Sequence, residues 1–320
     1  MTVPPTAAPG APGDPQAQRL AQRERLRRQI RRRRLLATAA LLTGVLAIAA
    51  VILAGLGNGS TGRSDATRSK QATAGTDGAA SGAPGGRVRN ATPQSNWVTH
   101  TGPVPILEYH VLGSPPPEAP YPELYVGRSD FSRQMNWLDE HGYQAVTLEE
   151  VENAWYHGGM LPIKPIVLSF DDGYRPQFTF ALPELRKHGW PGLLNLKAEG
   201  SDLYTSNVEA MVHAGWELAA HTIHHLDLTT LNATQLREEV AGSRAMLRRE
   251  YGVPVANFCY PAGRFNETVV AAVRAAGYVG ATTEIPGYAT ADRPYELDRL
   301  EILRSSGVAG MAAALSSHPG

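Results

Sequence analysis

Short apolar runs alternate with segments of helical periodicity from about residue 103 onwards. The apolar runs predict strands at residues 105–108, 145–147, 166–170, 192–196, 217–219, 256–260 and 278–283. Periodic segments predict helices at residues 129–141, 183–188, 207–214, 234–251 and 267–276, the first of them capped by Ser129 or Asp130. Residues 166–170 are apolar almost throughout, which is typical of a strand buried on both faces of a parallel sheet. The alternation predicts an α/β fold built from right-handed βαβ units.

The first 56 residues have a different pattern. Residues 1–34 contain nine arginines and only two acidic residues, with no apolar period, which predicts a basic, disordered tail. Residues 35–56 are 22 residues without a charge, and as a helix they would span about 33 Å, enough to cross a bilayer. The four arginines at 31–34 favour an N-terminus in the cytoplasm. We expect a single-pass anchor in the cell membrane with the rest of the chain outside. The competing interpretation is a cleaved signal peptide, whose apolar region is normally about 7–15 residues long.

Composition changes again after residue 56. Residues 57–100 are rich in Gly, Ser, Ala and Thr and predict a flexible linker. Residues 101–320 suit one domain, and they hold 16 basic and 26 acidic residues, so the domain is a poor candidate for binding nucleic acid. The arginine-rich tail is better explained by membrane topology and anionic lipid headgroups. Cys259 is the only cysteine, which excludes a disulfide within the chain and a thiolate metal site.

Two sequence motifs carry candidate chemistry. Asp171 and Asp172 follow the apolar run 166–168, where a buried strand would end in a loop. His221 and His225 come about fifty positions later, four residues apart. One Asp and two His form a ligand set that leaves a position open on zinc, and the second carboxylate is then available as a base. Alone, each motif has a plainer interpretation, a simple turn or a pair of surface histidines. Together they predict a metal-dependent hydrolase.

These motifs, in this order, resemble the polysaccharide deacetylases, the NodB-homology group of carbohydrate esterases. The resemblance spans about residues 103–303 and rests on four segments, at residues 105–110, 168–174, 215–228 and 258–263. Among the branches of the family, the chain is most similar to the deacetylases of poly-N-acetylglucosamine. The resemblance implies a distorted, incomplete (β/α) barrel, here preceded by the predicted transmembrane helix. In such barrels the chemistry lies at the C-terminal ends of strands, where Asp171, His221 and Tyr260 all fall.

The resemblance also implies roles for individual residues. Asp172, His221 and His225 match the metal ligands of the family, with one divalent metal ion expected and Zn²⁺ as the first choice. Asp171 matches the general base that takes a proton from the attacking water. His224 could replace His225 through a slip of register, but the residues that follow, 226–228, match the family pattern with His225 as the ligand. We therefore expect His224 either to line the site or to contact the metal ligands from outside.

The leaving amine requires a general acid. In the branch that acts on poly-N-acetylglucosamine, a Tyr-His pair near the start of the domain supplies it, and Tyr109 and His110 match this pair. The alternative is that His110 lies at the end of a strand and only hydrogen-bonds to the backbone. His318, near the C-terminus, is a weaker match to the histidine that many other family members use.

The segment 258–263 departs from the family pattern at two positions. Cys259 stands where the family usually has an Arg that steadies the catalytic Asp, and Ala262 stands where an aromatic residue is usual. Ala262 retains the backbone N–H that would stabilise an oxyanion. Arg299 matches a late Arg of the same branch and is predicted to replace the missing charge, unless it forms a surface ion pair.

Aromatic residues near these motifs are candidate sugar contacts. Tyr174 and Tyr260 are predicted to contact substrate, whereas Trp190 and Trp216 are expected in the core. The sequence thus predicts a monomeric hydrolase that removes acetyl groups from an extracellular or cell-wall glycan containing N-acetylglucosamine. Two alternatives stay open: an esterase acting on O-acetyl groups of xylan or a wall polymer, and a glycan-binding surface protein with weak or no activity.

Overall fold

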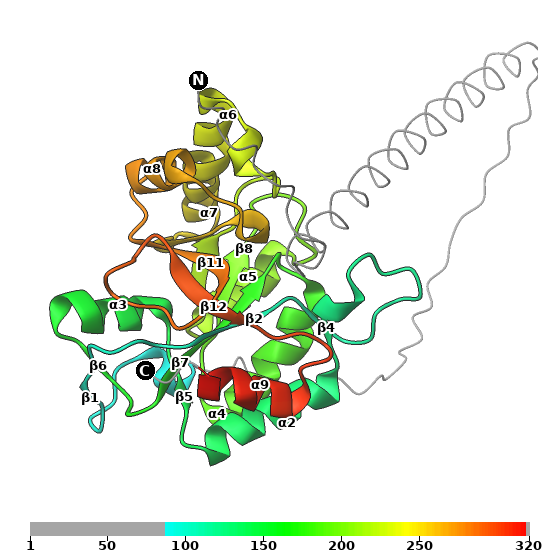
Figure 1. Cartoon of the computed structure of the whole chain (residues 1–320), viewed down its shortest axis with the longest axis vertical. Coiled ribbons are helices and arrows are strands. Elements are labelled where there is room, and N and C mark those ends of the chain that lie inside the picture. The colour runs from blue at the N-terminus through cyan, green and yellow to red at the C-terminus, as the bar shows by residue number, and fades with distance from the viewer. Residues whose placement is uncertain (1–86, 318–320) are drawn as a thin grey trace, which may run out of the picture. The chain divides into compact units, whose positions relative to one another are not determined.

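Seven parallel strands pair into a closed ring. Strands lie at the centre of the domain, with helices around them (Figure 1). Each strand pairs with the next in the order β2 (Ile106–Tyr109), β12 (Leu297–Glu301), β11 (Gly280–Pro286), β10 (Asn257–Cys259), β9 (Glu217–Ala220), β8 (Leu193–Leu196) and β7 (Pro165–Asp171). Pairing of β2 with β7 closes the ring. The predicted α/β barrel is confirmed, with seven strands instead of the eight of a complete (β/α)₈ barrel.

The computed structural model describes residues 87–317. The predicted basic tail, membrane anchor and most of the linker lie outside the described residues, as does His318. Within residues 87–317, no helix combines the length and the apolar character needed to cross a membrane.

Helices and three short strand pairings surround the ring. The helices are α2 (Arg128–Glu140), α3 (Leu148–His157), α4 (Leu182–His188), α5 (Thr205–His213), α6 (Ala233–Arg237), α7 (Ser243–Tyr251), α8 (Glu267–Ala275) and α9 (Gly307–Ser317). The short strands pair β1 (Val98–Thr99) with β6 (Met160–Leu161), β3 (Val111–Leu112) with β4 (Tyr125–Val126), and β5 (Gln144–Ala145) with the first residues of β7.

The helices differ from the prediction in two details. The first one begins at Arg128 with Gly127 as N-cap, so the predicted caps Ser129 and Asp130 lie inside the helix, where Asp130 pairs with Arg133. The helix predicted at 234–251 is α6 and α7 joined by a π-helical turn, Glu238–Gly242.

The C-terminal ends of the seven ring strands lie on one side of the ring, because all pairings between these strands are parallel. All of β7 is buried, and its Phe170 ring lies 5.7 Å from Tyr109 and 5.0 Å from Trp216 between ring centroids. Asp171 ends β7, and His221 directly follows β9. A rigid apolar interior thus holds both residues at the same end of the barrel.

Candidate active site

Asp172, His221 and His225 converge at the C-terminal end of the barrel. The Oδ1 atom of Asp172 lies 3.8 Å from Nε2 of His221 and 3.6 Å from Nε2 of His225. One ligand atom from each residue lies within 4.8 Å of the other two. The three residues that the sequence motifs singled out as candidate metal ligands therefore lie close together in the structure.

The backbone at this convergence is unusual. Within residues 87–317, the non-glycine residues with positive φ are Asp172 (75°), Thr222 (66°), His225 (57°) and Ala262 (53°). Such conformations cost free energy and gather at sites where function requires a particular geometry. Two of the four are predicted metal ligands, and Ala262 lies in the segment predicted to hold the oxyanion.

The donor atoms of this set fit a divalent metal ion. Nδ1 of His221 lies 2.9 Å from the carbonyl oxygen of Cys259, so that nitrogen donates a hydrogen bond and Nε2 keeps its lone pair. A carboxylate oxygen with two imidazole nitrogens is a familiar three-ligand set for Zn²⁺. Asp172, His221 and His225 are therefore the residues that would hold such an ion.

A second possible group shares His221 with this set. Ligand atoms of Asp171, His221 and Cys259 also lie within 4.8 Å of one another. However, Asp171 is engaged by other side chains, and burial raises the pKa of the Cys259 thiol well above its ordinary value. A thiol that stays protonated is a poor metal ligand, so this group is the weaker candidate.

His224 points to a different set of partners from His225. Its Nδ1 lies 2.6 Å from Oε1 of Glu239, and its Nε2 lies 3.3 Å from Oε2 of Glu199. The hydrogen bond with Glu239 raises the pKa of His224. Both ring nitrogens are therefore directed at carboxylates, which supports His225 as the ligand.

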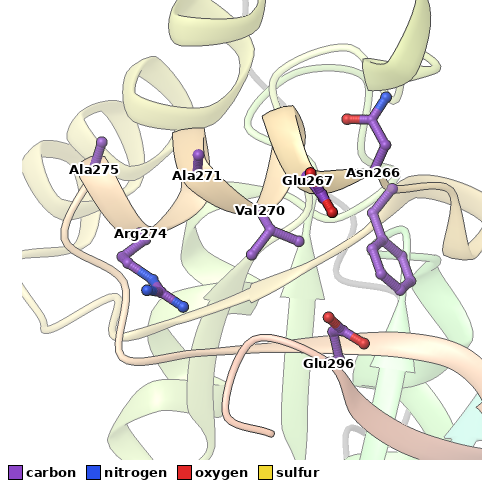
Figure 2. A pocket seen from close by; sticks show the side chains of 8 residues that line it. Asn266, Glu267, Val270, Ala271, Arg274, Ala275 and Glu296 are labelled. Atoms are coloured by element: carbon purple, nitrogen blue, oxygen red, sulfur yellow. The ribbon is translucent and has the colours of Figure 1, made fainter.

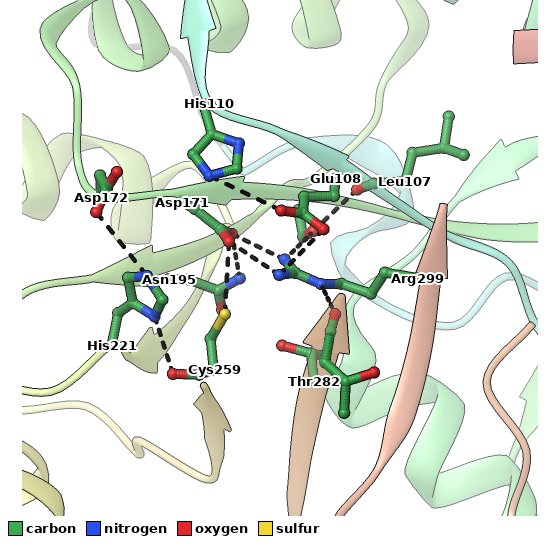
Figure 3. A network of polar contacts seen from close by, with 12 residues as sticks. Leu107, Glu108, His110, Asp171, Asp172, Asn195, His221, Cys259, Thr282 and Arg299 are labelled. Atoms are coloured by element: carbon green, nitrogen blue, oxygen red, sulfur yellow. Dashed lines mark hydrogen bonds and ion pairs between the residues drawn. The ribbon is translucent and has the colours of Figure 1, made fainter. Parts of the chain in front are cut away.

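The carboxylate of Asp171 is held by groups from three other strands (Figure 3). Arg299 of β12 donates from Nη1 to Oδ1 at 2.9 Å and from Nη2 to Oδ2 at 3.0 Å. Asn195 of β8 donates to Oδ1 at 2.7 Å, and the Cys259 thiol of β10 lies 3.5 Å from Oδ2. Arg299 is 1% exposed, so it does not form the surface ion pair that was the alternative.

Glu108 of β2 is a second carboxylate on the same guanidinium. Its Oε2 lies 3.2 Å from Nη2 of Arg299 inside the fully buried centre of the site. Burial raises the pKa of Glu108 well above its ordinary value. Burial also acts on Asp171, but there the charge of Arg299 prevails and the pKa lies well below its ordinary value. The guanidinium contacts both oxygens of Asp171 and only one of Glu108, and neighbouring carboxylates raise the pKa of Glu108 further.

His110 lies beside these two carboxylates, directly after β2. Its Nε2 is 3.8 Å from Oε1 of Glu108, and one ring nitrogen lies within 4.8 Å of a ligand atom of Asp171. The amide of Gln177 donates to the carbonyl oxygens of His110 at 2.9 Å and Asp171 at 2.6 Å. Gln177 thus ties together the two chain segments that carry the predicted acid and base.

The aromatic residues considered in the sequence analysis have different surroundings in the structure. Burial raises the pKa of the Tyr174 phenol, and its interaction with Asp172 raises it further. The prediction for Tyr260 as a substrate contact does not agree with its position, because its side chain is fully buried. Its hydroxyl donates to the carbonyl oxygen of Tyr295 at 3.0 Å, and its ring stacks on Phe265. Trp190 and Trp216 are buried, as predicted.

Several residues of the site were missed in the sequence. Glu108 and Asn195 are polar residues inside otherwise apolar strands, which is a usable signal because a buried polar group needs a partner. Lys197, whose Nζ lies 3.5 Å from Oδ1 of Asp172, follows β8 at the same end of the barrel. Gln177 and Glu239 lie on helical turns without any recognisable motif.

A separate hollow of about 600 Å³ runs along α8 (Figure 2). Phe265, Arg274 and Glu296 are among its lining residues. None of the predicted metal ligands or proton-transfer residues lines this hollow, so the candidate chemistry stays with the cluster around Asp171 and Asp172.

Comparison with known proteins assigns the chain to a family. The family model described as "Polysaccharide deacetylase" matches residues 158–281. The Bacillus subtilis (strain 168) protein YxkH, whose name assigns it to the polysaccharide deacetylases, is 31% identical over 226 residues, which cover 68% of this chain and 78% of YxkH. The chain belongs to the polysaccharide deacetylase family, and it is a hydrolase of that family.

Two further similarities are more limited. The poly-beta-1,6-N-acetyl-D-glucosamine N-deacetylase of Escherichia coli (strain K12) is 40% identical over 70 residues, which are 22% of this chain and 10% of that protein. The structure of the Streptococcus pyogenes deacetylase PplD in complex with acetate has a TM-score of 0.63 at 24% identity, covering 67% of this chain and 99% of PplD. This second likeness supports the fold.

Proposed function

We propose that this chain is a metal-dependent deacetylase that removes N-acetyl groups from a polysaccharide containing N-acetylglucosamine. The observation that carries the proposal is that Asp171 lies beside two kinds of group. The first is the set of three candidate metal ligands, which begins with the adjacent Asp172. The second is His110, one ring nitrogen of which lies within 4.8 Å of a carboxylate oxygen of Asp171. Hydrolysis of an amide needs a base and an acid at one reacting carbon, and this arrangement supplies both.

Asp172, His221 and His225 would hold the metal ion. When bound there, a divalent ion would polarise the acetyl carbonyl and make the attacking water more acidic. The hydrogen bond from His221 to the Cys259 carbonyl fixes the imidazole tautomer and ring orientation before the ion arrives.

Asp171 would accept the proton of the attacking water. Arg299 and Asn195 hold its carboxylate in one orientation and keep it ionised, which a proton acceptor requires. His110 would give a proton to the nitrogen of the leaving amine. Glu108, at 3.8 Å from Nε2 of His110, stands where it can orient that ring.

The preference for N-acetylglucosamine is supported by the segment shared with the Escherichia coli deacetylase of poly-β-1,6-N-acetyl-D-glucosamine. An acid at position 110 also matters more for an amine leaving group than for the alkoxide of an ester, since an amine cannot leave without a proton at neutral pH. Both points favour N-acetyl over O-acetyl substrates.

The test is acetate release from a panel of glycans by the purified protein. The panel contains oligomers of N-acetylglucosamine with β-1,6 and β-1,4 linkages, peptidoglycan, and O-acetylated xylan, each measured with and without a chelator. Release from N-acetylated glycans that stops with chelator and returns with Zn²⁺ is the expected result. Release from acetylated xylan alone would support the esterase alternative, and no release from any glycan would leave the binding protein as the alternative.

We further propose that residues 35–56 anchor the domain at the outer side of the cell membrane. The proposal rests on the uncharged run and the preceding arginines of the sequence. Protease added to intact cells should remove the domain. A soluble mature protein beginning near residue 57 would show that the segment is a cleaved signal peptide instead.

A further inference from the structure

The turn that carries His225 is held from outside by one buried carboxylate. Oε2 of Glu239 accepts the backbone N–H of Ile223 at 3.0 Å and that of His224 at 2.9 Å. Oε1 of the same carboxylate meets Nδ1 of His224 at 2.6 Å. Glu239 is 4% exposed, and it lies in the π-helical turn Glu238–Gly242. Three contacts from one side chain therefore converge on the segment between the two predicted histidine ligands.

This segment needs external support because its own conformation is unfavourable. Thr222 and His225 both have positive φ, which side chains other than glycine rarely adopt. Inside the turn, the backbone N–H of His225 donates to Oγ1 of Thr222 at 2.8 Å. Local strain of this kind persists only where the surroundings impose it.

The loop after β8 and the π-helical turn that carries Glu239 both pack against this turn. The backbone of the loop after β8 donates from Ala198 to the carbonyl oxygen of Thr222 at 3.0 Å, and from Glu199 to that of Ile223 at 3.1 Å. The π-helical turn packs so closely that a Cβ added to Gly242 would lie 3.1 Å from the side chain of Ile223. The turn is clamped between the β8 loop and the helix, and Glu239 supplies the charged contacts of that clamp.

We propose that Glu239 is a positioning residue for metal binding, which holds the turn from Thr222 to His225 in the conformation that presents both histidines to one ion. The proposal rests on the proposed function only in taking His221 and His225 as metal ligands. His224, with both ring nitrogens on carboxylates, belongs to the clamp, and its imidazole links Glu239 to the β8 loop through Glu199. Outer partners of this kind typically change metal affinity about 10–100-fold when removed.

The test compares Glu239→Gln with Glu238→Gln, its exposed neighbour on the same helical turn. The amide of Gln removes the negative charge and leaves one oxygen acceptor, where the carboxylate offers two oxygens to the two backbone N–H groups and the imidazole. We expect Glu239→Gln to bind Zn²⁺ about 10–100-fold more weakly than Glu238→Gln in competition with a chelator of known affinity. The amides of Ile223 and His224 should exchange hydrogen faster in the metal-free Glu239→Gln protein. At saturating Zn²⁺, kcat should recover most of its wild-type value, because no proton-transfer group has changed.

Melting temperatures of the metal-free variants separate this role from a purely structural one. A variant that loses stability while binding Zn²⁺ within twofold of Glu238→Gln would overturn the proposal. If Glu239→Gln does not fold, Glu239→Asp carries the test, since the shorter carboxylate can reach only part of the clamp; wild-type affinity in that variant would also overturn it. If the wild type binds Zn²⁺ but releases no acetate, the proposed function fails while this inference stands.

Discussion

Arg299 grips both carboxylate oxygens of Asp171, although 128 residues separate them in the sequence. The guanidinium also donates from Nε to the carbonyl oxygen of Thr283 at 2.7 Å, which fixes its plane. A planar fork of this kind determines where the carboxylate points as well as its charge. The orientation of the Asp171 carboxylate is therefore set by a residue of β12.

Arg299→Lys should keep the positive charge but lose the two-oxygen contact. Because a misplacement of about 1 Å can cost about 10²-fold in rate, we expect kcat to fall by about that factor while the metal content stays unchanged. Deacetylation kinetics and metal analysis measure both. The control is Arg293→Lys, an Arg of an exposed ion pair with Glu296. Wild-type kcat in Arg299→Lys would mean that Asp171 needs no such support.

Asp171→Asn should leave the metal bound and abolish most turnover. The amide has nearly the same shape and can still contact Arg299 through its oxygen, but it cannot accept a proton from water. Metal content and acetate release should therefore separate in this variant. Turnover near that of the wild type would remove Asp171 from the role of base.

His225→Ala should abolish metal binding, whereas His224→Ala should retain it with a loss of a few fold. The reason is the geometry of the turn, in which His225 faces Asp172 and His224 faces Glu199 and Glu239. Direct titration with Zn²⁺ measures the difference. The reverse result, with metal lost in His224→Ala and kept in His225→Ala, would show that the register is wrong.

His110→Ala should slow the hydrolysis of amides more than that of activated esters. A phenolate leaves without a proton, while an amine needs one, and general acid assistance is typically worth about 10²–10⁴-fold. Rates on an N-acetylated glycan and on an aryl acetate give the comparison. Equal losses on both substrates would exclude His110 as the acid, and His318 would be the next residue to replace.

Glu152 should make the free energy of unfolding depend on pH. Burial, with the nearby charge of Glu217, raises its pKa from 4.5 to about 8. The folded protein therefore keeps a proton that the unfolded chain has released, so stability falls as pH rises from about 4.5 to about 8. Glu152→Gln is neutral at every pH, and its gain over the wild type should be small at pH 5 and larger at pH 9, with an upper limit of about 5 kcal/mol.

Urea unfolding at the two pH values tests this prediction, with Glu140→Gln, an exposed residue that does not contribute to the pKa of Glu152, as the control. An equal change in stability at pH 5 and pH 9 would show that Glu152 titrates normally in the folded protein.

The strands of the barrel could be predicted where their residues are apolar throughout. Strand β7 is the best case, since every one of its residues is buried. Strand β12 (Leu297–Glu301) was missed because three of its five residues are charged, and the buried one, Arg299, belongs to the site. The helix α3 was also missed, although Thr147 and Glu150 form a capping box that the sequence displays.

The site could be predicted where the chemistry dictates the spacing. A metal ion restricts the choice of ligands, so Asp172 and the two histidines were recognisable from residue type and order. The supporting groups are less constrained, because any side chain that reaches the right point can serve. Asn195 and Glu239 therefore came from segments without a motif, and only the fold brings them to the site.

Because the strands form a closed ring, side chains from more than one strand can reach the same residue at its centre. Cys259 on β10 and Arg299 on β12 both reach Asp171, one with a thiol and the other with a guanidinium. The positively charged residue that contacts Asp171 can therefore stand on either strand, while Asp171 keeps its position. The residue type at position 259, taken alone, would class such a chain as an inactive relative. The set of side chains that meet at the centre of the barrel would not.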